Sequence, residues 1–324
     1  MTEKVELNAL VPASLQGERL DLVAARLFSD YSRSRLQSWI KNGELLVDGK
    51  QLRPRDKVSE GMSLSIVSVL KPEVSWKAQD IGLDIIYEDD SILVLNKPAG
   101  LVVHPAAGHA DGTLVNALLN HSPEMVALPR GGIVHRLDKE TSGIMVAAKS
   151  LPAHHNLVSQ LQERTVKREY CAVCVGTMTG GGTVDEPIGR HPKQRKKMAV
   201  RVLGGKPAIT HYRIVTRFAH HTRIVVNLET GRTHQIRVHM AHRRYPLIGD
   251  PVYGGRPRIP RGASDELISA LRSFPRQALH AQALGLIHPQ SGEELRFECP
   301  LAQDIVKLLE TLKREDPFST NEIY

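Results

Sequence analysis

The chain has 324 residues, a length that predicts two folding units rather than one small module. Hydrophobic residues make up 41% of it and charged residues 24%, a balance that supports a buried core and excludes a largely disordered chain. The start of the sequence has no secretory pattern and no apolar run reaches membrane-spanning length, so we expect a cytoplasmic protein without a membrane partner. The formal charge of +8 favours polyanionic partners.

The first seventy residues predict a compact unit in which two helices precede two strands. Apolar side chains at helical spacing predict one helix over 19–28 and a second over 32–43. A short strand at 45–47 then meets the Asp-Gly turn at 48–49, which favours a hairpin. The alternation at 63–66 is typical of a half-buried strand.

Basic side chains lie on the second predicted helix and around the hairpin. Arg33 and Arg35 are on the helix, and Lys50 and Arg53 are in or just after the hairpin. A helix face and a loop could therefore contact a phosphate backbone together. The residues alone leave RNA contact and a merely solvated helix face equally open.

Residues 71–80 lack periodicity and contain a proline, which is typical of a linker. We therefore expect one domain over 1–75 and a larger one over 76–324. In the larger domain, strand-like runs outnumber helical patterns without strict alternation, which predicts an α+β fold around a mixed, mainly antiparallel sheet. Strands are expected at 85–87, 92–95, 133–134, 144–147, 170–175, 212–215 and 224–228, and helices at 114–119, 151–162, 233–242 and 301–313.

Basic residues concentrate in one stretch of the larger domain. Residues 190–261 hold 17 Lys or Arg but only two acids, Glu229 and Asp250. Ordinary surfaces intersperse the two signs, so a stretch of this kind favours phosphate contact over a simple solvated face. The densest cluster comprises Lys193, Arg195, Lys196 and Lys197.

Two motifs have the spacing of metal ligands, but their setting opposes metal binding. Cys171 and Cys174 lie three apart on a predicted strand, where they point to opposite faces. His239 and His242 share a helix face, but no nearby carboxylate completes a site and the neighbouring arginines repel a cation. We therefore expect no metal. An odd total of three cysteines also suits a reducing cytoplasm.

One loop combines the residue types that a catalytic site requires. Between Gly132 and Gly143 a predicted strand runs into a loop and a new strand follows, a setting that often holds reactive groups. Asp138 lies beside Arg136 and Lys139, whose charges favour the ionised form that a nucleophile requires. On these residues alone, a surface salt bridge or a turn-capping aspartate is the more frequent explanation.

The whole loop is similar to a family signature. The sequence His-Arg-Leu-Asp-x-x-Thr-Ser-Gly at 135–143 resembles the active-site motif of the RluA-type RNA pseudouridine synthases. The resemblance extends, in the family's order, to the segments at 96–101, 168–170 and 231–239. The first seventy residues resemble the S4-type RNA-binding module. Together these similarities cover nearly the whole chain.

The resemblance implies an isomerase that converts uridine to pseudouridine in RNA and needs neither a cofactor nor a metal. Asp138 would be the essential carboxylate, acting by attack on ribose C1′ or by removal of a ribose proton. Arg136 would fill the place that the flipped base leaves. Tyr170 would stack on the uracil and take part in proton transfer at C5, and Arg237 would pair with Asp138 as the third catalytic residue.

The resemblance assigns two further residues to RNA binding. His135 belongs to the motif itself, and Leu228 would help to form the floor of the base pocket. For Leu228 an ordinary core position is an equally good explanation.

The resemblance also implies a partner, large-subunit (23S) ribosomal RNA, either free or in a precursor of the 50S particle. We expect no DNA partner and a monomeric protein. Two other functions remain open: a non-catalytic RNA-binding ribosome-assembly factor with the same fold, and a metal-dependent hydrolase of nucleic acid.

Overall fold

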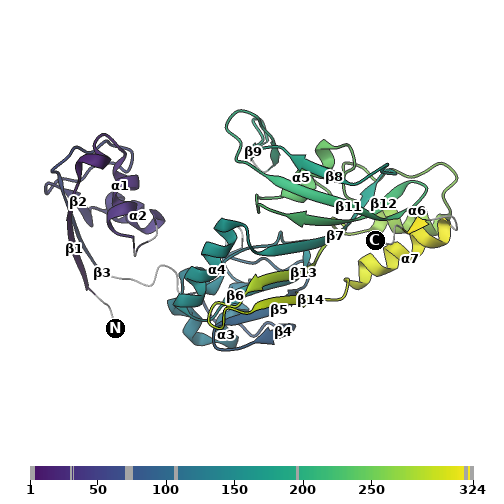
Figure 1. The fold of residues 1–324 in the computed structure, drawn as a ribbon, viewed down its shortest axis with the longest axis horizontal. Coiled ribbons are helices and arrows are strands. Elements are labelled where there is room, and N and C mark those ends of the chain that lie inside the picture. Colours follow the sequence, from purple (N-terminus) through teal and green to yellow (C-terminus); the bar gives the residue numbers. More distant parts are fainter. Residues whose placement is uncertain are drawn as a thin grey trace. The chain divides into compact units, whose positions relative to one another are not determined.

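The computed structural model describes residues 4–29, 31, 33–69, 76–105, 109–194, 197–316 and 320–321. The chain forms two compact units, Met1–Ser75 and Trp76–Tyr324 (Figure 1).

The first unit combines a three-stranded sheet with two helices. Strands β1 (Lys4–Leu10), β3 (Ser63–Val69) and β2 (Leu45–Val47) pair antiparallel in the order β1-β3-β2. Helices α1 (Leu20–Leu27) and α2 (Arg33–Asn42) pack with the sheet in one hydrophobic core. Both helices lie where the apolar spacing predicted them, whereas β1 was not predicted.

The predicted turn after β2 is present, but it does not open into a hairpin. Asp48 and Gly49 both have left-handed backbone conformations, with φ of 49° and 71°. A single bridge between Val47 and Lys50 closes the turn. The ladder partner of β2 is β3, which begins only at Ser63.

The larger unit is built on one ten-stranded sheet. Its strands are β4 (Ile85–Glu88), β5 (Ile92–Lys97), β6 (Ser142–Ala148), β7 (Lys167–Val175), β8 (Gly182–Asp185), β11 (Ile209–Arg217), β12 (His221–Leu228), β13 (Leu279–Ile287), β14 (Glu294–Glu298) and β15 (Thr320–Asn321). The order along the main path is β15-β11-β12-β7-β13-β6-β5-β4, with β14 beside β13 and β8 beside β11. The pairing of β13 with β6 is parallel and the other pairings of these strands are antiparallel. The predicted α+β fold with a mixed, mainly antiparallel sheet is confirmed.

Helices lie around this sheet and at its ends (Figure 1). They are α3 (Leu114–His121), α4 (Leu151–Glu163), α5 (Gln235–His242), α6 (Asp265–Ser273) and α7 (Gln303–Glu315). Short 3-10 helices occur at Ala13–Leu15, Pro123–Ala127 and Pro129–Gly132, and β9 (Ile188–Arg190) pairs with β10 (Met198–Val200) in a separate two-stranded sheet. Across the described ranges, no helix combines the length and the apolarity that crossing a membrane requires.

The apolar patterns located most of these elements. The predicted hairpin over 85–95 is β4 with β5, and four predicted helices correspond to α3, α4, α5 and α7. The strand predicted at 133–134 is wrong, because this segment makes only an isolated bridge between Ile133 and Ala147. Five strands between β7 and the C-terminal helix, namely β8, β9, β10, β13 and β14, were not predicted, and neither was α6.

A glycine allows the start of β6 to pack closely against β13. Gly143 has φ of 115°, and a Cβ atom built on it would lie 2.1 Å from the carbonyl oxygen of Ala281. Only glycine fits both the conformation and the close approach. The loop that ends at Gly143, which contains Asp138, is thereby fixed against the centre of the sheet.

Candidate active site

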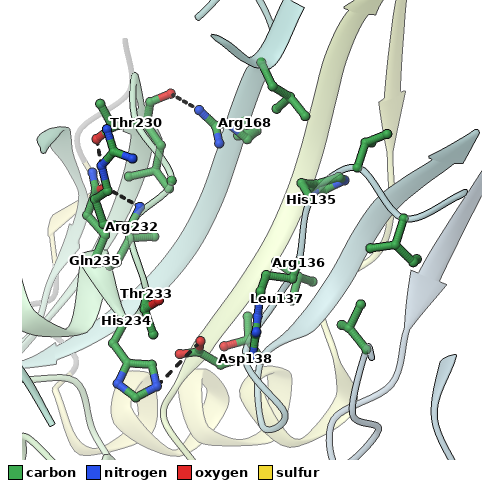
Figure 2. A pocket seen from close by; sticks show the side chains of 18 of the residues that line it. His135, Arg136, Leu137, Asp138, Arg168, Thr230, Arg232, Thr233, His234 and Gln235 are labelled. Atoms are coloured by element: carbon green, nitrogen blue, oxygen red, sulfur yellow. Dashed lines mark hydrogen bonds and ion pairs between the residues drawn. The ribbon is translucent and has the colours of Figure 1, made fainter. Parts of the chain in front are cut away.

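A cavity of about 810 Å³ opens in the larger unit. Its walls come from the loop before β6, from β7, and from the segment that joins β12 to α5 (Figure 2). Six of the residues that the sequence predicted for this domain's site converge here. The cavity is lined by His135, Arg136, Asp138, Tyr170, Leu228 and Arg237.

Arg237 joins Asp138 to a second carboxylate. Its Nη1 donates to Oδ2 of Asp138 at 3.0 Å, while its Nε and Nη2 donate to the two carboxylate oxygens of Asp250 at 2.7 and 2.9 Å. Arg237 and Asp250 are buried, whereas 19% of the Asp138 side chain is exposed. Burial alone would lower the pKa of Arg237, but hydrogen bonds and charges of both carboxylates raise it. The predicted contact between Asp138 and Arg237 is present.

Asp250 is held in place by its own backbone surroundings. The N–H groups of Val252 and Tyr253 donate to its Oδ1 at 2.9 and 3.0 Å. Burial alone would raise the pKa of Asp250, but Arg237 and these two amides lower it. A fixed, ionised Asp250 leaves the Arg237 guanidinium one orientation, in which its remaining Nη1 faces Asp138.

The ring of His234 also points toward Asp138 (Figure 2). Its Nε2 lies 3.8 Å from Oδ1 of Asp138, and its Nδ1 is 2.8 Å from the hydroxyl of Tyr253. His234 precedes α5 with a left-handed φ of 57°, a conformation that costs on the order of 1 kcal/mol outside glycine. Burial lowers the pKa of His234, although the charge of Asp138 opposes this.

A buried lysine supports the loop that carries Asp138. The Nζ of Lys97, at the end of β5, donates to the carbonyls of Pro98, Leu101 and Lys139 at 2.7, 3.0 and 3.0 Å. Burial lowers the pKa of Lys97 to about 8. Because Lys139 directly follows Asp138, this side chain ties β5 to the loop.

Arg276 holds the same loop from the side of β13. Its Nη1 donates to the carbonyl of Glu140 at 3.1 Å, and its Nη2 donates to Oγ of Ser142 at 3.1 Å. The guanidinium also pairs with both oxygens of Asp304, at the start of α7, at 2.6 and 2.8 Å. The position of Asp138 therefore depends on residues far away in the sequence.

Tyr170 and Leu228 form apolar parts of the cavity wall. Tyr170 lies on β7 and is 7% exposed, and burial raises the pKa of its hydroxyl. The charge of Asp138 raises it further, whereas Arg168 opposes the shift, so the hydroxyl stays protonated at neutral pH. Leu228 ends β12 and packs against the main core while it lines the cavity, and its place in the floor of a base pocket stays a prediction.

His135 lines the cavity, but its ring is engaged with the sheet. Its Nε2 accepts a hydrogen bond from the N–H of Val146 in β6 at 3.0 Å. Burial lowers the pKa of His135 to about 3, and the charge of Arg168 contributes. The neutral imidazole thus anchors the motif to β6, and its contact with RNA stays a prediction.

Acid is expected to destabilise the fold through such buried histidines. Burial lowers the folded-state pKa to about 3 for His135 and about 4 for His221 and His280, from an ordinary value of 6.5. At a pH between the folded-state pKa and 6.5, the unfolded chain binds more protons than the folded chain. The free energy of unfolding therefore falls as the pH drops below 6.5. The slope is about 1.4 kcal/mol per pH unit for each histidine. Urea unfolding at pH 7.5, 6 and 5 measures this slope. The variant His135→Gln should lower the slope by the contribution of one histidine. An unchanged slope in this variant would contradict the assignment to His135.

Arg136 is exposed at the cavity, two residues before Asp138. Among the residues that the structure describes, its guanidinium has no hydrogen-bond or ion-pair partner. The side chain is therefore available to contact a bound substrate.

Predicted RNA-binding residues of the first unit have structural contacts of their own. Arg33 on α2 donates to Oδ2 of the fully buried Asp21, at 2.6 Å in the shorter contact, and Arg19 and Gln37 bind the same carboxylate. The Arg33 side chain remains 46% exposed. Arg35 lies on the same helix. RNA contact by Arg33 and Arg35 stays a prediction.

The basic cluster of the larger unit lies in the connection between β9 and β10. Lys193 is exposed and Lys197 is partly exposed there. Arg195 and Lys196 fall outside the described residues. Neither Lys193 nor Lys197 lines the cavity.

The residues with metal-like spacing have other environments. Cys171 and Cys174 are both buried in β7 as free thiols. The ring of His239 is buried, with Nδ1 2.9 Å from Oγ1 of Thr210 and Nε2 2.9 Å from the carbonyl of Glu186. Within the described ranges, no group of three or more His, Cys, Asp or Glu could hold a metal ion.

Comparison with known proteins identifies the two units. Residues 91–242 match the family model described as RNA pseudouridylate synthase, and residues 18–64 match that of the S4 domain. The chain is 58% identical over 315 residues to ribosomal large subunit pseudouridine synthase D of Pseudomonas aeruginosa, covering 97% of this chain and 98% of that protein. It is 54% identical over 316 residues to the protein of the same name from Escherichia coli K12, covering 97% of each.

A solved structure has the same fold. Human RNA pseudouridylate synthase domain containing 4 matches with a TM-score of 0.56 and 27% identity, covering 71% of this chain and 93% of that one. The full-length similarity, together with the motif around Asp138, leads to one conclusion: this chain belongs to the RluA-type family of RNA pseudouridine synthases, which are isomerases.

Proposed function

We propose that this protein isomerises specific uridines to pseudouridine in large-subunit (23S) ribosomal RNA, with Asp138 as the essential catalytic residue. The observation that carries the proposal is the partly exposed Asp138 carboxylate, held by the buried Arg237–Asp250 pair in a cavity that Tyr170 also lines. The two relatives compared above are named as ribosomal large subunit pseudouridine synthases, which supports this substrate.

The chemistry requires the target base to leave its stack, at a cost of a few kcal/mol. A cavity of about 810 Å³ is large enough for a nucleotide. Arg136, which is free at the cavity edge, would stack where the base was. Tyr170 would stack on the uracil inside.

The reaction breaks the N1–C1′ bond and joins C5 to C1′, and the proton from C5 is lost while N1 gains one. Asp138 can attack C1′ and form a covalent intermediate, or it can remove a ribose proton to give a glycal. In both routes Arg237 orients the carboxylate. No step requires a redox cofactor or a metal.

The two units would have different functions. Residues 1–75 would bind RNA as an S4-type domain, with Arg33 and Arg35 contributing, and residues 76–324 would carry catalysis. We propose that the protein acts as a monomer in the cytoplasm, on free 23S ribosomal RNA or on a precursor of the 50S particle.

A tritium-release assay tests the function. The purified protein is incubated with large-subunit ribosomal RNA that carries tritium at C5 of its uridines, with and without a chelator. We expect tritium release at a few sites, insensitive to the chelator, with the RNA chain intact. Strand cleavage that the chelator abolishes would indicate a hydrolase instead, and no release at all would contradict the proposal.

Two kinds of basic residue are expected to act differently. Neutralising Lys193, Arg195, Lys196 and Lys197 together should weaken RNA binding and flatten its salt dependence, because fewer phosphates are contacted. Arg136→Ala should instead lower the single-turnover rate more than the affinity. Filter binding at several salt concentrations, with tritium release on the same RNA, separates these effects. Equal salt slopes for the wild type and the fourfold variant would remove the cluster from the interface.

A further inference from the structure

A second buried arginine lies in the cavity wall, and none of the described residues gives it a counter-charge. Arg168 is on β7, two residues before Tyr170 and on the same face of the strand. It is 7% exposed and lines the cavity. Figure 2 shows its guanidinium pointing across the cavity toward the segment that follows β12.

The hydrogen bonds of Arg168 leave most of the guanidinium unused. Its Nη2 donates to the backbone carbonyl of Glu229 at 3.1 Å and, more weakly, to that of Leu228 at 3.5 Å. Its Nε is buried and has no hydrogen-bond partner among the residues that the structure describes. Its Nη1 faces Gly231, where an added Cβ would lie only 2.7 Å away.

The acids near Arg168 are engaged elsewhere. The cavity lining contains two carboxylates, those of Asp138 and Glu229. Asp138 pairs with Arg237, and Glu229 binds His211 at 2.7 Å and Arg164 at 3.3 Å. Glu169 belongs to the opposite face of β7, where it accepts a hydrogen bond from Gln282. Within the described part of the chain, Arg168 therefore has no carboxylate partner.

An unpaired buried charge is unfavourable for folding, so its presence at a cavity points to a ligand. We propose, on the basis of the proposed function, that Arg168 is a substrate-binding residue whose guanidinium contacts an anionic oxygen of the target nucleotide. That oxygen belongs either to a phosphate or to the uracil, whose oxygens gain negative charge if the N1–C1′ bond breaks with the electron pair on the base. Both sources present the same chemistry to the arginine, and kinetics distinguish them.

The test uses the full-length protein and C5-tritiated large-subunit ribosomal RNA. If Arg168 stabilises charge on the uracil, Arg168→Met lowers the single-turnover rate at saturating RNA by roughly 100-fold and leaves the affinity unchanged. If it binds a phosphate, Arg168→Met weakens binding and lowers the salt slope by about one. Arg168→Lys, which keeps the charge, should recover part of either loss. Arg272→Met, which removes an exposed arginine from α6, is the matched control.

Stability separates this role from a structural one. Because Arg168→Met removes an uncompensated buried charge, its thermal midpoint should equal or exceed that of the wild type. Gly231→Ala keeps the charge of Arg168 but displaces its guanidinium. It should therefore lower whichever parameter, the rate or the affinity, Arg168→Met lowers. A lower midpoint for Arg168→Met, combined with wild-type kinetics in Arg168→Lys and Gly231→Ala, would overturn the proposal. So would wild-type rate, affinity and salt slope in Arg168→Met. An inactive wild type would contradict the proposed function itself.

Discussion

Asp138→Asn is expected to lower single-turnover tritium release from C5-labelled ribosomal RNA by on the order of 10⁴-fold or more. An amide can neither attack C1′ as a carboxylate does nor accept a ribose proton. The fold should survive, because Arg237 keeps its two hydrogen bonds to Asp250. RNA affinity should change little, since phosphate contacts provide most of it.

The controls for this variant separate catalysis from binding and folding. Asp265→Asn makes the same chemical change at an exposed position in the first turn of α6, and it should retain the wild-type rate. Circular dichroism and filter binding report the fold and the affinity of each variant. Wild-type turnover by Asp138→Asn would show that another group performs the reaction.

Asp250→Ala is expected to destabilise the protein by on the order of 3–5 kcal/mol, because it removes the principal partner of the buried Arg237. The remaining contact with Asp138 is single, so the guanidinium also loses its fixed orientation. We therefore expect a large fall in the rate of tritium release as well. Urea unfolding gives the stability, and the rate is measured at a temperature where the variant is folded.

A double-mutant cycle identifies the cause of that loss. If the unpaired charge is responsible, Arg237→Met combined with Asp250→Ala should be more stable than the sum of the two single changes predicts. Additive effects, or a loss below about 1 kcal/mol for Asp250→Ala, would mean that the pair contributes little to the fold.

Sequence patterns located the helices and strands whose own apolar residues recur at a regular spacing. Helices such as α4 and α7 have an apolar stripe, and β4 with β5 has a clear turn between two apolar runs. In contrast, β13 is buried on both faces along most of its length, and such an apolar run does not distinguish a strand from a buried helix. The alternation of Val5, Leu7 and Ala9 was a usable indication of β1 that the prediction did not include.

The residues proposed for the active site followed from the family motif, whereas the residues that support them depend on tertiary contacts. Asp250 stood out as an acid within a basic stretch, but nothing local paired it with Arg237. Arg276 reaches Glu140 and Ser142 across more than 130 positions of sequence. Arg168 was visible only as part of a motif, since its missing counter-charge is a property of the folded cavity.

Mapping pseudouridines in ribosomal RNA tests the central claim most directly. A strain that lacks this gene is compared with the same strain carrying the wild-type gene or the Asp138→Asn gene. Specific pseudouridines of 23S ribosomal RNA should disappear in the deletion, return with the wild-type gene, and stay absent with Asp138→Asn although the protein is present. An unchanged modification map in the deletion strain, or full restoration by Asp138→Asn, would contradict the account.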